Sequence, residues 1–197
     1  QGKRYQAVLY TDAGGRTDYY ALNGESMRKT FLRTPVEFSR ISSRFSNGRK
    51  HPVLNTIRAH KGVDYAASSG TPIKSTANGK IIHIGKKGGY GNTIIVQHGT
   101  RYSTLYAHMS KYRGGLKNGS RVRQGQTIGY VGSSGLATGP HLHYELRVDG
   151  THRDPLRVKL PGADPLNEKY MADFTSKAKP LIAQIDLVRD VQVASNN

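Results

Sequence analysis

Short runs in which apolar and polar residues alternate, broken at intervals by glycine, dominate the first 160 residues of the chain. Alternation with a period of two places the apolar side chains on one face of a strand, so the pattern predicts a mainly β, antiparallel protein. The strongest strand signals lie at Lys80–Gly85, Asn92–His98, Arg101–Ala107, Thr127–Val131 and His141–Val148. The glycine-rich residues 86–91 would join the first two of these strands as a flexible hairpin loop.

The beginning of the chain has weaker strand signals, at residues 5–10, 17–22 and 28–33. They predict a small N-terminal β meander with turns at residues 12–15 and at Asn23-Gly24. Strands this few and short cannot bury a core of their own. We therefore expect residues 1–40 to be the remaining edge of an upstream β domain, with residues 34–43 as the connection to the part that follows.

The end of the chain changes to a helical pattern. Asp164-Pro165 is typical of a helix start, and an apolar stripe follows at Phe174, Ala178, Leu181, Ile185 and Val188. Pro180 interrupts the stripe, which predicts two helices or one kinked helix. We expect this segment, residues 161–197, to dock on a catalytic domain formed by residues 41–160.

Composition limits the chemistry that the chain can perform. The chain has 197 residues and no cysteine, so a thiol nucleophile, an iron–sulfur cluster, a cysteine-based zinc finger and a disulfide scaffold are excluded. Any metal ion must therefore be held by histidine and carboxylate side chains.

The charge is strongly basic, with 30 Lys and Arg against 13 Asp and Glu, a formal net charge of +17. Such a surface attracts polyanions, which include nucleic acid, acidic membranes and anionic cell-wall polymers. The basic residues are dispersed and form no known nucleic-acid-binding motif, so we expect no nucleic-acid partner. No run of about 18 apolar residues occurs, so we also expect no membrane span.

Candidate chemistry is concentrated in three segments that contain histidine. His141 and His143 project from the same face of one predicted strand, roughly 7 Å apart. His60 and Asp64 lie in a glycine-containing segment upstream, and His108 is isolated between them. Two neutral imidazoles and one carboxylate suit Zn²⁺ and leave a coordination position open for water. The remaining histidines are expected to be packed or surface residues: His51, His83, His98 and His152.

These segments resemble the lysostaphin/LytM-type zinc metallopeptidases. The resemblance rests on the residues at 60–67, His-Lys-Gly-Val-Asp-Tyr-Ala-Ala, on Gly-Thr-Pro-Ile at 70–73, and on residues 91–99, 106–109 and 139–145. It extends from about Ser43 to Leu156. Residues 40–45 and 51–54 further resemble the Gram-negative murein endopeptidase branch, in which an extra domain precedes the catalytic domain.

The resemblance implies a role for each candidate residue. His60, Asp64 and His143 would hold one Zn²⁺ per chain, and His108 and His141 would be catalytic histidines that do not bind the metal. All five are present, unlike in degenerate members that only activate other hydrolases. The implied fold is a small antiparallel β catalytic domain, and the implied place of action is the periplasm or cell envelope. An auxiliary groove tyrosine of the family has no secure match, and Leu54 or Arg58 lies near its place.

The implied reaction is hydrolysis of peptidoglycan cross-links between D-alanine and meso-diaminopimelate, with peptidoglycan stem peptides as partners. The chain has no HExxH motif, so His108 or His141 must act as general base, and the sequence does not say which. Glu145 would either support the site or form an ion pair with a neighbouring arginine. The alternatives are a glycyl-glycine endopeptidase, a non-catalytic wall-binding regulator and a basic nucleic-acid binder.

Overall fold

The computed structural model describes residues 6–37, 40–50 and 57–195. The chain divides into two compact units, which are described separately. One unit contains the residues up to Thr30 together with those from Leu160 onward, and the other contains Phe31–Lys159. The domain boundaries at residues 40 and 160 that the sequence suggests stay predictions.

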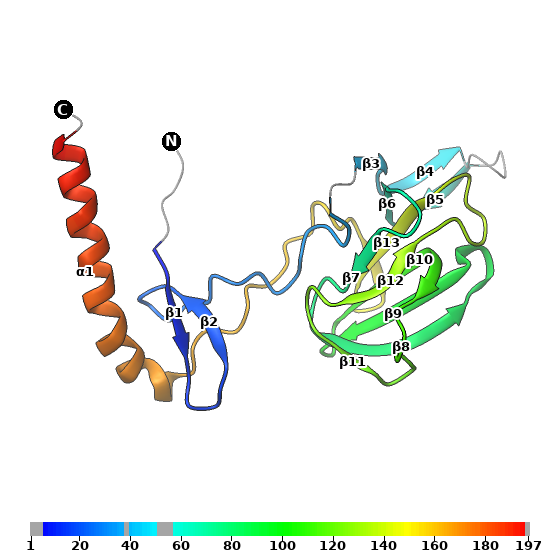
Figure 1. The fold of residues 1–197 in the computed structure, drawn as a ribbon. Coiled ribbons are helices and arrows are strands. Elements are labelled where there is room, and N and C mark those ends of the chain that lie inside the picture. The colour runs from blue at the N-terminus through cyan, green and yellow to red at the C-terminus, as the bar shows by residue number, and fades with distance from the viewer. Residues whose placement is uncertain (1–5, 38–39, 51–56, 196–197) are drawn as a thin grey trace. The chain divides into compact units, whose positions relative to one another are not determined.

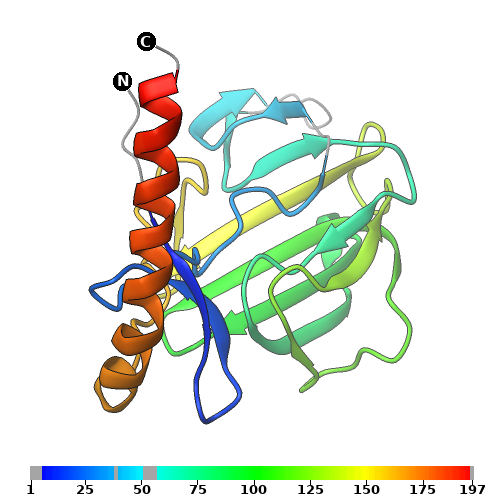
Figure 2. The same cartoon turned by 60° about the vertical axis from the view of Figure 1, so that its left-hand side comes forward.

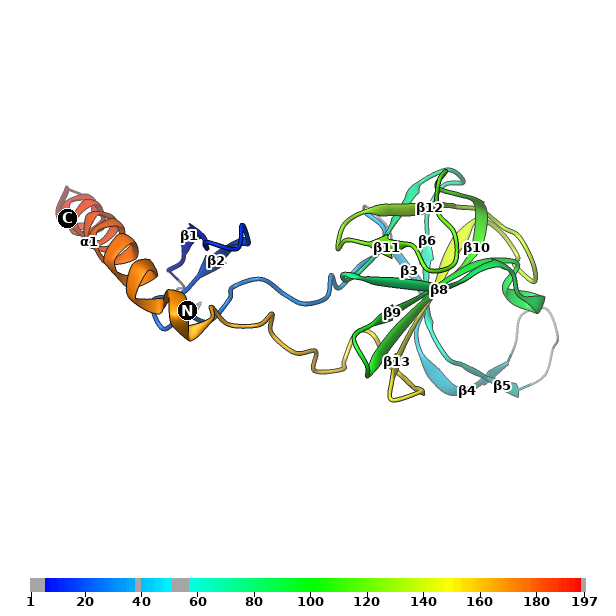
Figure 3. The same cartoon turned by 90° about the horizontal axis from the view of Figure 1, so that it is seen from below.

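The unit of residues 31–159 is built on a large antiparallel sheet (Figures 1 and 3). Its strands follow the order β11-β8-β9-β10-β13-β6-β3, while β12 pairs with β10 and β7, and β14 pairs with β13. The bounds are β3 Arg40–Ser43, β6 Val63–Ala66, β7 Pro72–Lys74, β8 Gly79–Lys86, β9 Asn92–His98, β10 Tyr102–Tyr112, β11 Arg121–Val122, β12 Thr127–Val131, β13 His141–Val148 and β14 Thr151–Arg153. Strands β4 (Ser46–Lys50) and β5 (Ile57–His60) pair separately in an antiparallel arrangement.

The core of this unit takes apolar residues from both faces of the sheet. Ile94 and Val96 of β9 and Ile128 of β12 are fully buried in the main hydrophobic cluster. On the other face of the sheet, Ile95, Leu105 and Ala107 form a second small cluster. The central strands are therefore covered on both faces, which makes them a rigid base for functional side chains.

The mainly β, antiparallel fold is confirmed, and the five strongest strand predictions all correspond to observed strands. Two details differ. The strand predicted at residues 101–107 continues to Tyr112, and β3 lies in the segment expected to be a connection. The sequence of β3, Arg-Ile-Ser-Ser, has too little apolar character to signal a strand. It becomes one by pairing with β6 at the edge of the sheet.

The other unit consists of a hairpin and a helix (Figures 1 and 2). Strands β1 (Val8–Thr11) and β2 (Thr17–Tyr20) pair in an antiparallel arrangement. The turn between them is closed by Asp12 Oδ1, which accepts hydrogen bonds from the backbone N–H groups of Gly14 and Arg16. The predicted third strand at residues 28–33 is wrong, because that segment forms only an isolated bridge between Lys29 and Gly162.

The C-terminal segment forms a single helix, α1 (Met171–Ser195), which continues through Pro180. It does not begin at Asp164-Pro165 as expected. A 3₁₀ turn at Glu168–Tyr170 precedes it, and the side chain of Asn167 accepts a hydrogen bond from the N–H of Lys169. Pro180 is exposed, so water can satisfy the carbonyl that the missing proline N–H leaves without a partner.

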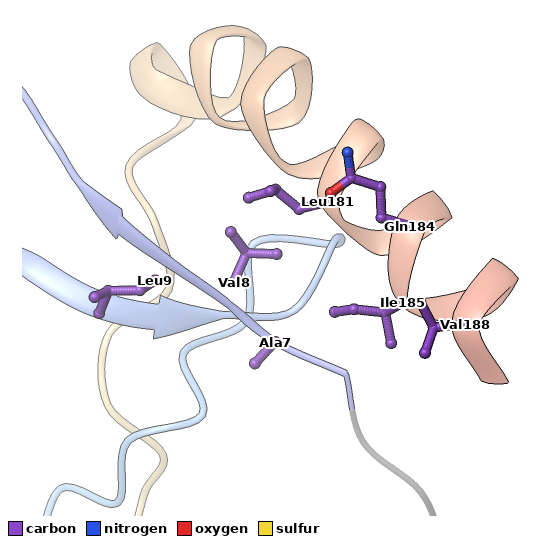
Figure 4. A pocket seen from close by; sticks show the side chains of 7 residues that line it. All are labelled: Ala7, Val8, Leu9, Leu181, Gln184, Ile185 and Val188. Atoms are coloured by element: carbon purple, nitrogen blue, oxygen red, sulfur yellow. The ribbon is translucent and has the colours of Figure 1, made fainter. Parts of the chain in front are cut away.

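The buried face of α1 is narrower than the predicted apolar stripe. Phe174, Ala178 and Ile182, spaced four residues apart, pack on the hairpin. Leu181, Ile185 and Val188 are exposed instead. They line a shallow apolar pocket together with Ala7, Val8, Leu9 and Gln184 (Figure 4). The lining has no ionisable side chain, and its one polar side chain is the amide of Gln184, so these residues offer no group for general acid–base catalysis.

Candidate metal centre and active site

Three side chains predicted to bind a metal converge in the unit of residues 31–159. His60 ends β5, Asp64 lies in β6, and His143 lies in β13, where the strand register sets it directly opposite Asp64. Asp64 Oδ1 lies 2.8 Å from His143 Nδ1 and 3.0 Å from His60 Nε2. The two imidazole nitrogens, His60 Nε2 and His143 Nδ1, are 3.2 Å apart.

This arrangement fits a tetrahedral zinc ion. Zinc–ligand bonds of about 2.0–2.1 Å place neighbouring donor atoms about 3.3 Å apart, close to the spacing observed among His60, Asp64 and His143. Three protein ligands leave a fourth position open, which is the pattern of catalytic rather than structural zinc sites.

The second ring nitrogen of each candidate ligand, His60 and His143, lies near an oxygen that orients the ring. His60 Nδ1 donates to the carbonyl of Arg44 at 2.8 Å, which leaves the lone pair of Nε2 for a metal. The roles are reversed in His143, whose Nε2 lies 3.3 Å from Glu145 Oε1 while Nδ1 points toward Asp64. Each ring is thus held with its lone pair toward the common centre.

The electrostatics of the site favour a cation. Burial alone would raise the pKa of Asp64, but the contacts with His143 and His60, whose rings can donate to it when both ring nitrogens carry a proton, hold it far below its ordinary range, so the carboxylate is ionised. Burial lowers the pKa of His143, while the hydrogen bonds to Asp64 and Glu145 outweigh this and raise it to about 9. The two carboxylates therefore stabilise positive charge at this place, and a divalent ion can supply that charge in place of a proton.

The two other predicted site residues lie beside these donors. The ring of His108 is 4.7 Å from the ring of His141 and 6.0 Å from that of His143, measured between centroids. His141 Nε2 lies 4.0 Å from Asp64 Oδ1. All five residues singled out from the sequence are therefore brought together in one site.

Both of these imidazoles are also fixed by backbone carbonyls. His108 Nδ1 donates to the carbonyl of Ser134 at 2.7 Å, and His141 Nδ1 donates to that of Gly139 at 2.8 Å. In each ring, Nε2 is then the basic nitrogen. Burial is the main reason why the pKa of His108 is lowered to about 4, so that imidazole is neutral at pH 7.

The backbone at His108 departs from regular strand geometry. The pairing of β10 with β9 shifts register between Tyr106 and Met109, and His108 has a positive φ of 59°. Such a conformation is uncommon for a residue other than glycine and is often found at functional sites. The irregularity changes the direction of the His108 side chain relative to its neighbours in β10.

Two loops beside His108 are locked to each other through their backbones. A Cβ atom on Gly135 would lie 2.5 Å from the carbonyl oxygen of Gly89, so this close approach requires glycine. Ser134 Oγ accepts from the N–H of Asn92 and donates to the carbonyl of Met109. The carbonyl that orients His108 therefore belongs to a well-anchored residue.

Sequence reasoning singled out the five residues that the structure brings together, but it did not point to several residues around them. Ser134 and Tyr90 gave no signal, because neither stands in a recognisable spacing with a histidine. His152 was expected to be an ordinary packed or surface residue, yet its Nε2 lies 3.0 Å from Glu145 Oε2. The Asp149-Gly150 turn signal could have predicted a hairpin of β13 with β14, whose register sets His152 opposite Arg147 and thus near Glu145.

The other histidines behave as expected where they are described. His98 is buried, and its two ring nitrogens form hydrogen bonds with the carbonyl of Asn78 and with Thr104 Oγ1. His83 has a buried Nε2 without a hydrogen-bond partner among the described residues, and it lies in β8. His51 and Leu54 fall outside the described residues, and the side chain of Arg58 does too, so the match for a groove tyrosine stays untested.

Residues 58–155 match the sequence profile of peptidase family M23. The catalytic domain of lysostaphin from Staphylococcus simulans is 32% identical and superimposes with a TM-score of 0.53, over 60% of this chain and 90% of that domain. The chain belongs to peptidase family M23.

Two other proteins are similar over a larger part of the chain. The peptidoglycan DD-endopeptidase ShyC of Vibrio cholerae is 41% identical over 186 residues, which are 94% of this chain and 42% of that protein. A zinc-containing peptidase of Vibrio cholerae, 35% identical, superimposes with a TM-score of 0.64 over 79% of this chain and 47% of that structure.

The chain spans less than half the length of the curated relatives that it matches. Within the described ranges, no helix combines the length and the apolar character needed to cross a membrane.

Proposed function

We propose that this M23 chain is the catalytic part of a zinc endopeptidase that hydrolyses peptide cross-links of peptidoglycan. The observation that carries the proposal is the convergence of three donor atoms, from His60, Asp64 and His143. Two further imidazoles, those of His108 and His141, lie beside these donors and are not among them. The similarity to a peptidoglycan DD-endopeptidase supports the substrate class.

A bound zinc ion would supply a Lewis acid and lower the pKa of a water molecule toward neutrality. The protein must then move protons. The basic Nε2 atoms of His108 and His141 lie on the side chains that flank the donor set. One imidazole would take a proton from the attacking water and return it to the leaving amine. The other would hydrogen-bond to the oxyanion of the tetrahedral intermediate.

The overall reaction adds water across one peptide bond. The hydroxyl goes to the carbonyl carbon and the proton goes to the amine nitrogen, which gives a carboxylate and a free amine. We propose the bond from D-alanine to meso-diaminopimelate as the one that is cut, in the periplasm or cell envelope. The formal net charge of +17 suits a substrate rich in free carboxylates.

Digestion of purified cross-linked muropeptides tests the proposal. The zinc-loaded protein is expected to convert dimers to monomers, and Asp64→Ala, which removes one ligand, is expected to be inactive. No conversion by the zinc-loaded wild type would contradict the proposal. Cleavage of pentaglycine but not of muropeptide dimers would instead favour a glycyl-glycine endopeptidase. Undiminished binding of the zinc-free Asp64→Ala protein to peptidoglycan, without cleavage by the wild type, would favour a non-catalytic wall-binding role.

A further inference from the structure

Glu145 is a carboxylate buried directly behind the candidate metal centre. It lies on β13 two residues after His143, so both side chains share one face of the sheet, and its side chain is 0% exposed. A buried charge is costly unless several partners satisfy it. The arrangement of those partners therefore indicates what the residue is for.

The two oxygens of Glu145 face different groups. On one side, Oε1 accepts a hydrogen bond from the hydroxyl of Tyr90 at 2.6 Å and lies 3.3 Å from His143 Nε2. On the other side, Oε2 accepts from Arg147 Nε at 3.2 Å and lies 3.0 Å from His152 Nε2. The Oε2 side neutralises and anchors the carboxylate, while the Oε1 side reaches the metal-ligand candidate.

A simple ion pair between Glu145 and Arg147 would explain only half of this arrangement. It needs Oε2 alone, and it gives no reason for a second oxygen to point toward His143. The ring of Tyr90 also lies 5.6 Å from that of His143, tilted by 41°, so the tyrosine contacts both residues. Glu145, Tyr90 and His143 thus form one connected group.

We propose that Glu145 is a positioning residue that fixes the ring of His143 with Nδ1 toward the metal, and that Tyr90 acts through Glu145. This inference rests on the proposed function, because it requires His143 to be a metal ligand. A carboxylate behind a metal-bound imidazole holds the ring orientation and increases its basicity as a ligand. Arg147 and His152 keep Glu145 itself in place.

Tyr90 brings a second element into the arrangement. It ends the short 3₁₀ turn η1 (Gly88–Tyr90), in the loop between β8 and β9. The same loop is bound to the segment that orients His108, because Leu136 N–H donates to the carbonyl of Gly89 at 2.8 Å. One glycine-rich loop therefore supports a metal-ligand candidate through Tyr90 and Glu145, and a catalytic candidate through its contact with residues 134–136.

The experiment compares Zn²⁺ affinities of the whole chain by competition with a chromophoric chelator. The variants are Glu145→Gln, Tyr90→Phe and the double variant, with Tyr19→Phe as a matched control because Tyr19 is 54% exposed on the hairpin. The amide of Glu145→Gln keeps the size of the side chain, but its single oxygen cannot serve both His143 and Arg147. The melting temperature of each zinc-free protein measures any purely structural effect.

Glu145→Gln is expected to weaken zinc binding about 10–100-fold, and Tyr90→Phe by a smaller factor. Since Tyr90 acts through Glu145, the double variant should bind zinc about as weakly as Glu145→Gln alone, and Tyr19→Phe should bind like the wild type. An affinity within twofold of wild type for Glu145→Gln, with a lowered melting temperature of the zinc-free protein, would overturn the positioning role. Additive losses in the double variant would overturn the link through Tyr90.

Two safeguards keep the outcomes separate. If the wild type binds no zinc, the proposed function fails, whereas wild-type binding with unaffected variants contradicts only the role of Glu145 and Tyr90. If Glu145→Gln does not fold, Tyr90→Phe alone decides, because it leaves the carboxylate and its ion pair with Arg147 intact. Unchanged zinc affinity in Tyr90→Phe then overturns the proposal.

Discussion

Each of the four histidines of the site is oriented by a hydrogen bond from one ring nitrogen to a fixed oxygen. In His60, His108 and His141 the oxygen is a backbone carbonyl, and in His143 it belongs to Glu145. What separates ligand candidates from catalytic candidates is the place of the other nitrogen. Only His60 and His143 present it within about 3 Å of Asp64 Oδ1, as ligands of one ion must.

The first prediction concerns this division of roles. His108→Ala is expected to lower muropeptide cleavage about 10²–10⁴-fold, the usual contribution of general acid–base catalysis, while zinc content stays near one ion per chain. His60→Ala is expected to lose both activity and zinc. Metal analysis of the purified variants, alongside the cleavage rate, checks this. Loss of zinc from His108→Ala would show that His108 is a ligand.

A second prediction concerns pH and the buried His98. Burial lowers the pKa of His98, so this imidazole takes up a proton at a lower pH in the folded protein than in the unfolded chain, where protonation occurs as the pH falls through about 6.5. Protonation thus favours the unfolded state, and stability is lost as the pH falls below about 6.5. His98→Gln cannot titrate and lacks this contribution.

The measurement is urea unfolding of both zinc-saturated proteins between pH 7.5 and 5. The wild type should lose more stability over this range than His98→Gln. The other histidines are present in both proteins, so their effects cancel in the comparison. Parallel pH dependences would contradict the assignment of His98 as a neutral buried residue.

At the scale of elements, the turn from β5 into β6 is what sets His60 and Asp64 against β13. Gly62 lies in this turn, and a Cβ atom there would be 2.5 Å from the carbonyl oxygen of Tyr144 and 2.7 Å from His143 Cε1. Only glycine allows this approach, so the spacing between His60 and Asp64 depends on it as much as on the ligands themselves.

Gly62→Ala is therefore expected to weaken zinc binding and to lower the free energy of unfolding by about 1–3 kcal/mol, the usual cost of overpacking. Gly114→Ala is the matched control, because a Cβ atom there meets nothing within 4 Å. Chelator competition and urea unfolding measure the two effects. Equal zinc affinities and equal free energies of unfolding in the two variants would show that the backbone at Gly62 can shift to accommodate a Cβ atom.

The helix α1 depends on a few buried contacts with the hairpin. The ring of Phe174 lies 5.3 Å from that of Tyr10 and 5.9 Å from that of Tyr20, both edge to face. Phe174→Ala is expected to cost this unit about 3–5 kcal/mol, seen as lost hydrogen-exchange protection of the hairpin and helix amides. Leu187→Ala, at a side chain 67% exposed, should change protection by less than about 0.5 kcal/mol. Similar losses in both variants would contradict this packing.

Sequence patterns identified these elements unequally well. In β9 and β12, residues on both faces of the sheet are buried, and a short run of mostly β-branched residues is the local signal that predicts each strand. In α1 the sequence predicts that Leu181 and Ile185 belong to the buried face, but the hairpin buries Ile182 instead. The apolar residues of this helix occupy more than one face, and only the partner element selects the face that is buried.

For the whole molecule, the metal is expected to contribute to stability as well as to activity. His60 and Asp64 flank the turn from β5 into β6, whereas His143 lies about 80 residues later in β13, so an ion that binds all three stabilises the folded state over the unfolded chain. Free zinc at about 1,000 times its dissociation constant adds about 4.1 kcal/mol.

Chelation of zinc should consequently lower the melting temperature and abolish cleavage, and added zinc should restore both. Asp64→Ala is the control, since its melting temperature should not respond to chelator or zinc. Calorimetry of the two proteins with and without chelator checks the prediction. A wild-type melting temperature that is independent of zinc would show that the three side chains do not hold the ion.

The sequence by itself determined the antiparallel β class and the five strongest strands, and it singled out the five candidate site residues, because runs of strand-forming residues and motif spacing are local properties. Only the tertiary structure decided which ring nitrogens face the common centre and which oxygens orient them. It also decided that β3 joins the sheet and that Tyr90 reaches Glu145, 55 residues further along the chain. Such contacts depend on how strands and loops pack against one another, and no local pattern of residues encodes that packing.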